Sequence, residues 1–103
     1  MKICIVGDGG WGTALAMILL ENGHEVVLWG PFEDYLAEIR AKGENVRYLP
    51  GVKLPQGLVW TSDPAAAAAG AGLVVLATPS HFYRSVCARF AGLVPAGADV
   101  VSV

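Results

Sequence analysis

The sequence predicts an α/β domain in which a doubly wound parallel sheet forms the middle of three layers, α/β/α. Three observations support this prediction. Short apolar runs alternate along the chain with longer segments of helical character, as in parallel sheets with right-handed crossovers. A glycine-rich segment separates the first apolar run from the first helical segment. The composition is 54% hydrophobic and 16% charged, with much alanine, which suits a sheet covered on both faces.

The elements follow from the hydrophobic pattern of a chain long enough, at 103 residues, for one domain with a modest core. Strands are predicted at the short apolar runs, residues 2–6, 24–29, 58–60, 72–77 and 99–103. Helices are predicted at residues 11–22, 32–42, 64–69 and 80–91. The expected strand order is 3-2-1-4-5, which places the first strand beside a reversal of strand order.

The first two helices have recognisable boundaries. Gly23 follows the first helix and predicts a left-handed C-cap there. The second helix carries Glu33 and Asp34 in its first turn, where the helix dipole favours acidic residues. Its buried face is predicted from apolar residues at helical spacing: Tyr35, Leu36 and Ile39.

The second half of the chain opens with a long connection, residues 43–57, rich in Gly and Pro and of a length typical of functional or disordered loops. Ser62 or Asp63 is predicted to cap the third helix, with Pro64 at its first position. We expect the last strand, residues 99–103, to be buried. Because natural domains seldom stop inside a buried strand, we also expect a truncated chain.

Composition and charge argue against several classes of protein. The formal net charge is −2 and no basic cluster occurs, so we expect no nucleic-acid partner. No apolar run reaches the ~18 residues that a membrane span requires, and no signal peptide is recognisable. Cys4 and Cys87 have no metal or redox spacing, so we expect no metal site, two packed thiols and a reducing cytoplasm.

The glycines at positions 7, 9 and 12 predict the chemistry. The pattern G-x-G-x-x-G between a strand and a helix is the fingerprint of a Rossmann dinucleotide-binding fold. Gly7 makes the tight turn, Gly9 lets a diphosphate approach the backbone, and Gly12 lets the helix pack closely on the strand. The free amides and the dipole of the helix then attract the diphosphate. The structural alternative is an ordinary tight turn.

The same fold places residues 7–12, 29–32 and 77–82 together, at the carboxyl ends of the strands. A ribose-binding acid would stand at the end of the second strand, where this chain has Gly30. Glu33 is the nearest acidic candidate, with Asp34 beside it, and both are explained equally well as charges in a first helical turn. No Lys or Arg between residues 28 and 39 would pair with a 2′-phosphate, which favours NAD over NADP.

Five further residues are interpreted one by one. Phe32 would lie against the adenine or simply pack, and Phe82 would form the nicotinamide side. His81 is a candidate general base, but no acidic partner is visible in the sequence, and a surface position in a first helical turn explains it as well. His24 is expected in solvent. Asp8 would repel a diphosphate unless it points outward, and the sequence gives no reason for it.

Residues 7–14, Gly-Asp-Gly-Gly-Trp-Gly-Thr-Ala, resemble the signature G-x-G-x-W-G-(T/S)-A of NAD(P)-dependent glycerol-3-phosphate dehydrogenases. Residues 44–51 with 53–55, and residues 79–81, are similar to the same family. Together with residues 27–29 they cover most of the chain in the family's order. The tryptophan and the N-x-x-Y-L-P-G loop are far more specific than three glycines.

The resemblance implies an enzyme that reduces dihydroxyacetone phosphate to sn-glycerol 3-phosphate with NADH or NADPH and supplies glycerophospholipid synthesis. It also implies a homodimer, and a second, helical catalytic domain that holds the small phosphorylated substrate. The family's catalytic lysines would lie just past Val103 and in that domain, because Lys2, Lys42 and Lys53 match neither motif. We therefore assign no catalytic residue, and expect residues 1–103 to bind a dinucleotide without catalysing the reaction.

By the same resemblance, Gly10 and Trp11 would contact the diphosphate region, and Pro31 and Phe32 the adenosine. The full set of predicted cofactor-binding residues is Gly7, Gly9, Gly10, Trp11, Gly12, Pro31, Phe32, Pro79 and Phe82. The chain departs from the family at Asp8, where Ala or Ser is common, and at Gly10, where Ser or Asn is common. It also has Pro31-Phe32 where a basic residue is frequent, which again favours NAD.

Two alternatives remain at this point. One is another two-domain Rossmann dehydrogenase, acting on a β-hydroxyacid or a 2-ketoacid, against which the tyrosine-containing loop at residues 45–51 argues. The other is a nucleotide-binding module without catalysis, which the abrupt end of the chain at Val103 disfavours because a finished module covers its edge strand.

Overall fold

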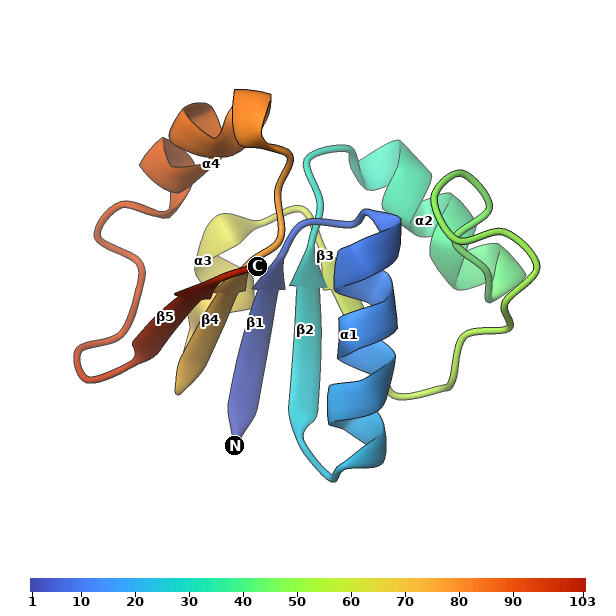
Figure 1. The fold of residues 1–103 in the computed structure, drawn as a ribbon, viewed down its shortest axis with the longest axis horizontal. Helices are drawn as coiled ribbons and strands as arrows, with labels where there is room; N and C mark the ends of the chain where they lie inside the picture. The colour runs from blue at the N-terminus through green and yellow to red at the C-terminus, as the bar shows by residue number, and fades with distance from the viewer.

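The computed structural model describes residues 1–103 and shows one parallel sheet with helices on both faces (Figure 1). The strands are β1 (Lys2–Val6), β2 (Glu25–Trp29), β3 (Val59–Thr61), β4 (Leu73–Leu76) and β5 (Asp99–Ser102). The helices are α1 (Gly10–Glu21), α2 (Glu33–Lys42), α3 (Pro64–Ala68) and α4 (Tyr83–Phe90), with a 3-10 turn, η1 (Ser80–Phe82), before α4. The order β3-β2-β1-β4-β5, with every pair parallel, confirms the predicted doubly wound topology.

Alternate residues of the central strands build two separate cores, one on each face of the sheet. Ile3 and Ile5 of β1 belong to the core that α1 and α2 cover, whereas Cys4 and Val6 belong to the core under α3 and α4. Burial raises the pKa of the Cys4 thiol to about 11. Cys4 is therefore a small apolar core residue, as the sequence predicts.

The local signals for helix ends are confirmed in detail. Gly23 has φ of +90°, its N–H donates to the Leu20 carbonyl at 3.0 Å, and the His24 N–H donates to the Leu19 carbonyl at 3.2 Å. This pair of bonds is the Schellman motif that ends a helix. At the start of α3 the Asp63 carboxylate accepts the Ala65 N–H at 3.0 Å, so Asp63, rather than Ser62, is the cap.

Three expectations differ from the structure. The last strand is not buried, because β5 is an edge strand that pairs only with β4 and all four of its residues are exposed. The helix expected from residue 80 begins as a 3-10 turn and becomes α-helical at Tyr83. His24 is half-buried rather than solvated, and its Nδ1 atom has no hydrogen-bond partner.

No helix combines the length and the hydrophobicity that crossing a membrane would require.

Candidate functional site

A cavity of about 600 Å³ lies at the carboxyl edge of the sheet, where the strand order reverses at β1. Its walls come from the turn after β1, the segments after β2 and β4, the loop after α2, and α4. This is the position in which open α/β sheets bind ligands. All nine residues predicted to bind the cofactor line it: Gly7, Gly9, Gly10, Trp11, Gly12, Pro31, Phe32, Pro79 and Phe82.

Residues 7–12, which run from β1 into the first turn of α1, form a glycine corner. This corner leaves an open space beside the first turn of α1. Gly7 has φ of +139°, and a Cβ there would lie 2.6 Å from the Ala77 carbonyl oxygen. A Cβ on Gly12 would lie 3.2 Å from the Gly7 carbonyl oxygen and 3.3 Å from Cγ2 of Ile5. A Cβ on Gly9, in contrast, would meet nothing within 4 Å. The first and third glycines are therefore required by packing, and the second leaves room for a ligand.

Backbone donors face this opening. The first hydrogen bond of α1 runs from the Thr13 N–H to the Gly9 carbonyl at 3.0 Å, and the Thr13 hydroxyl donates to the same oxygen at 2.8 Å. The amides of residues 10–12, which precede Thr13, have no acceptor within the helix. The helix dipole gives this end a partial positive charge. No side chain caps the helix at Gly9. The corner can therefore receive an anionic group such as a diphosphate.

Three aromatic side chains border the cavity with most of their surface exposed. Trp11 is 64% exposed, Phe32 66% and Phe82 54%. They come from α1, from the end of the segment after β2, and from η1. Large exposed aromatic faces around a cavity suit a ligand with flat rings, such as adenine and nicotinamide.

A buried polar network holds the loop after α2 against the glycine corner. Asn45, which is fully buried, donates through Nδ2 to the Asp8 carbonyl at 2.7 Å and to the Thr13 hydroxyl at 3.0 Å. The Tyr35 hydroxyl donates to the Asn45 side-chain oxygen and accepts the Arg47 N–H at 3.0 Å. Burial raises the pKa of Tyr35. One asparagine thus joins the loop, α1 and the turn after β1.

Two arginines line the cavity, and the sequence interpretation missed both. The Arg47 guanidinium lies 4.5 Å from the centre of the Tyr35 ring, and that of Arg89 lies 5.0 Å from the Trp29 ring. Arg47 lies outside residues 28–39, the segment in which a cation for a 2′-phosphate is expected. The loop resemblance at residues 44–51 was the signal that could have drawn attention to it.

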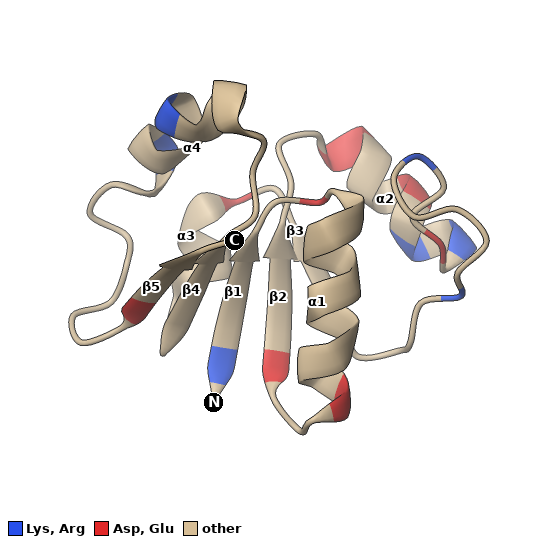
Figure 2. Cartoon of the chain, in the orientation of Figure 1, with Lys and Arg blue, Asp and Glu red and all other residues tan.

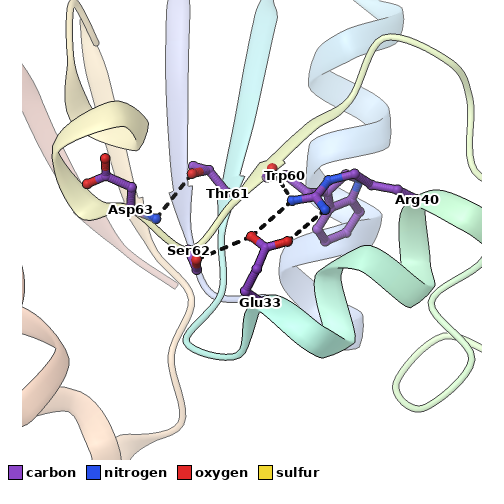
Figure 3. A network of polar contacts seen from close by, with 6 residues as sticks. All are labelled: Glu33, Arg40, Trp60, Thr61, Ser62 and Asp63. Atoms are coloured by element: carbon purple, nitrogen blue, oxygen red, sulfur yellow. Dashed lines mark hydrogen bonds and ion pairs between the residues drawn. The ribbon is translucent and has the colours of Figure 1, made fainter.

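Glu33, the nearest acidic candidate for a ribose contact, does not line the cavity. Figure 3 shows its carboxylate paired with Arg40, at 2.8 Å, and accepting the Ser62 hydroxyl at 3.3 Å. Arg40 also donates to the Trp60 carbonyl at 3.0 Å, so the pair links α2 to β3. The hydrogen bonds from Arg40 hold the pKa of Glu33 below its usual value. The structure thus favours the structural explanation of Glu33.

The structure shows where Asp8 lies, a residue for which the sequence analysis offers no reason. Its carboxylate lines the cavity and lies over Gly30, where a Cβ would be 2.6 Å from Asp8 Oδ2. Burial raises the pKa of Asp8, and the positive charge of Arg47 partly opposes that shift. In Figure 2 the turn between β1 and α1 is acidic, whereas the neighbouring carboxyl ends of the strands carry no charge. Asp8 therefore places a carboxylate at the end of β2.

His81 is exposed on η1 beside Phe82, with ring centres 4.1 Å apart, and does not line the cavity. No acidic group hydrogen-bonds to it, so the geometry gives no support to a general base. No lysine lines the cavity either. The site on this chain is therefore equipped to bind a ligand.

Comparison with known proteins agrees with this description. Residues 2–103 match the family model described as the NAD-dependent glycerol-3-phosphate dehydrogenase N-terminus. A glycerol-3-phosphate dehydrogenase (NAD(P)+) of Stenotrophomonas maltophilia is 46% identical over 99 residues, which are 96% of this chain and 29% of that protein. The corresponding protein of Geobacillus kaustophilus is 47% identical over 87 residues, 84% of this chain and 25% of the relative.

Solved structures give the same result. The crystal structure of glycerol-3-phosphate dehydrogenase from Coxiella burnetii superposes with a TM-score of 0.90 at 35% identity, over 98% of this chain and 31% of that one. The enzyme from Saccharomyces cerevisiae superposes with a TM-score of 0.89 at 27% identity, over 99% of this chain and 33% of that one. The chain therefore spans about a third of the length of the proteins it resembles.

Proposed function

The chain belongs to the NAD-dependent glycerol-3-phosphate dehydrogenase family, and from this premise we propose that it is the cofactor-binding part of an enzyme interconverting dihydroxyacetone phosphate and sn-glycerol 3-phosphate with NAD(P)H. The observation that carries the proposal is the glycine corner. It leaves open space above Gly9 at the amino end of α1, inside a cavity bordered by exposed aromatic rings. A dinucleotide has a diphosphate for the first feature and two flat rings for the second.

The residues of this chain would bind and orient the cofactor. The amides at Gly10 and Trp11 would hold the diphosphate, while Pro31 and Phe32 would flank the adenosine. Pro79 and Phe82 would border the nicotinamide and keep water from that face. The nicotinamide, when bound, supplies or accepts the hydride. All of these residues line one cavity, which is the arrangement that the proposal needs.

Catalysis and substrate binding are proposed for sequence outside residues 1–103. The support is that the match with the Stenotrophomonas maltophilia relative covers 29% of that protein. We further propose a cytoplasmic homodimer that supplies glycerophospholipid synthesis, and NAD as the preferred cofactor. For this last point the support is the lack of any Lys or Arg between residues 28 and 39.

The test is a titration of the intact protein with NADH, followed by nucleotide fluorescence, for the unchanged protein and for Gly9→Val. Gly9 has φ of −71° and its Cβ position is open, so valine fits the fold and protrudes into the cavity. We expect NADH affinity to fall by about 5- to 140-fold, since overpacking costs about 1–3 kcal/mol and each tenfold is about 1.4 kcal/mol.

Two comparisons make the result interpretable. Gly9→Ala adds a single carbon and should give a smaller loss of affinity, and thermal unfolding of both variants should match that of the unchanged protein. Undiminished NADH affinity in a folded Gly9→Val protein would refute the site. A separate assay of dihydroxyacetone phosphate reduction by the intact protein distinguishes the enzyme from a nucleotide-binding module and from a dehydrogenase of other hydroxyacids or ketoacids.

A further inference from the structure

The end of β2 has an unusual source of negative charge. The strand ends at Trp29, and the next residue, Gly30, has no side chain. The space that a side chain would fill is taken by the carboxylate of Asp8, whose Oδ2 lies 2.6 Å and Cγ 3.0 Å from an ideal Cβ on Gly30. A carboxylate thus stands at the end of β2, although it comes from the glycine corner after β1.

This position has a definite role in dinucleotide-binding folds. An acidic residue about twenty positions after the fingerprint, at the end of β2, usually accepts a hydrogen bond from the ribose 2′-hydroxyl. None of the nearby candidates can do so here, because Gly30 lacks a side chain, Glu33 is paired with Arg40, and neither Glu33 nor Asp34 lines the cavity. Asp8 is the one acidic residue that lines the cavity.

The Asp8 carboxylate is also available to a ligand. The ion pairs of the structure join Glu33 to Arg40 and Glu38 to Lys42, and no side chain donates a hydrogen bond to the Asp8 carboxylate. Its backbone is nevertheless held in place, since its carbonyl accepts Nδ2 of the buried Asn45 at 2.7 Å. A positioned carboxylate on the wall of a cavity, whose hydrogen bond within the protein is to its own backbone, has unused acceptor capacity.

We propose that Asp8 recognises the adenosine ribose of the cofactor through its 2′-hydroxyl and thereby makes the protein selective for NAD over NADP. The inference rests on the proposed function, because it requires a dinucleotide in this cavity. A 2′-phosphate would bring negative charge against the carboxylate and would lose the hydrogen bond that the hydroxyl donates. Arg47, which also lines the cavity, is the cation that would oppose this discrimination.

The experiment measures the dissociation constants of NADH and NADPH separately, by fluorescence titration of the intact protein, and compares their ratio among variants. Asp8→Asn keeps the shape and removes the charge, so we expect tighter NADPH binding with NADH affinity largely kept. Asp8→Ala removes the acceptor as well, so we expect weaker NADH binding and tighter NADPH binding. In both variants the NADPH-to-NADH ratio of dissociation constants should fall by about tenfold or more.

A rescue variant separates recognition from a general change of charge. Removal of the Asp8 carboxylate takes away one of the two groups that a Cβ on Gly30 would meet, the other being Cδ2 of Leu36 at 2.9 Å, which is the end of a side chain. The double variant Asp8→Ala/Gly30→Asp then returns an acid to the end of β2 from the other side. We expect it to restore the preference for NADH. The matched control is Glu33→Gln, an acidic residue outside the cavity, which should leave both dissociation constants unchanged.

The outcomes separate this inference from the proposed function. An unchanged ratio in Asp8→Asn and Asp8→Ala, with NADH still bound, would overturn the inference and leave the dinucleotide site standing. Failure of the unchanged protein to bind either nucleotide would overturn both. A fall in the ratio that the double variant reverses would support the inference.

Discussion

Asp8 and Glu33 lie near the end of the same strand, β2, and their surroundings are opposite. Glu33 is exposed, touches Arg40 at 2.8 Å, and has a pKa lowered chiefly by the hydrogen bonds from that arginine. Asp8 is partly buried in the cavity, makes no ion pair, and has a pKa raised chiefly by its burial. A carboxylate that the protein already pairs stabilises the fold, whereas a cavity carboxylate without an ion pair keeps acceptor capacity for a ligand.

The difference depends on the polar network behind Asp8. Asn45 fixes the Asp8 carbonyl from inside the protein, so the side chain is presented to the cavity from a rigid support. The region around Glu33 has no such interior support, and its contacts with Arg40 and Ser62 lie at the surface (Figure 3). The two regions should therefore respond very differently when a single partner is removed.

The largest effect is expected when the interior support is removed by Asn45→Ala. The change leaves the Tyr35 hydroxyl proton without its buried acceptor and the Asp8 carbonyl without its buried donor. Each orphaned group costs about 1–3 kcal/mol, so we expect the free energy of unfolding to fall by roughly 3 kcal/mol. Urea denaturation of the purified protein measures it.

The matched control is Asn22→Ala. Asn22 is an exposed asparagine whose Nδ2 donates to the Ile18 carbonyl at 3.0 Å. Because this hydrogen bond is exposed, its loss leaves no buried polar group without a partner. We expect a much smaller loss of stability than in Asn45→Ala. Equal losses in the two variants would show that the network around Asn45 does not hold the loop as described.

The sequence predicts those features of the fold and the cavity that depend on short stretches of neighbouring residues. Apolar runs and helix signals predict the strand order, and the turn chemistry of Asp63-Pro64 predicts the start of α3. Strand–turn–helix context likewise places the glycine corner beside the segments after β2 and β4. These features depend on neighbours in the sequence or on the general rules of parallel sheets.

The other features of the cavity depend on contacts between segments far apart in the sequence. No repeating pattern of residue types indicates such contacts. Asn45 meets the Asp8 backbone across 37 positions and Thr13 across 32, from a loop without regular structure. Similarly, nothing local indicates that the Asp8 carboxylate fills the space beside Gly30, or that Arg47 stacks on Tyr35. The sequence could therefore place the segments that line the cavity but could not show which acidic residue lies among them.

An intermediate effect is expected from Asp8→Asn in the absence of nucleotide. Because the pKa of Asp8 is raised above its ordinary 3.8, the folded protein binds this proton more tightly than the unfolded chain does. Its contribution to stability is then lost as the pH rises from the unfolded pKa through the folded one, and stays lost at neutral pH. Asp8→Asn should therefore be more stable than the unchanged protein at pH 7, with a gain that disappears below the unfolded pKa.

The control for this prediction is Asp34→Asn, which changes an exposed acid in the first turn of α2. Its carboxylate interacts favourably with the helix dipole, so its removal should lower stability slightly at pH 7, the opposite sign to Asp8→Asn. Thermal unfolding across pH 3–8 measures both. A loss of stability at neutral pH in Asp8→Asn would mean that the Asp8 carboxylate has a stabilising partner in the fold.

The smallest effect is expected from Glu33→Gln, which tests the other side of the comparison. The pKa of Glu33 is lowered below its ordinary 4.5, so its stabilising contribution is present above that unfolded value and is lost as the pH falls through the folded one. Glu33→Gln should therefore be slightly less stable than the unchanged protein at pH 7 and equally stable in acid. Because both partners are exposed, salt should screen the difference, and 1 M NaCl should remove most of it. Urea denaturation at pH 7 and in acid, with and without salt, measures these differences.

A change in NADH or NADPH affinity in Glu33→Gln would contradict the contrast between Asp8 and Glu33, since it would place Glu33 with Asp8 among the groups that a ligand reaches.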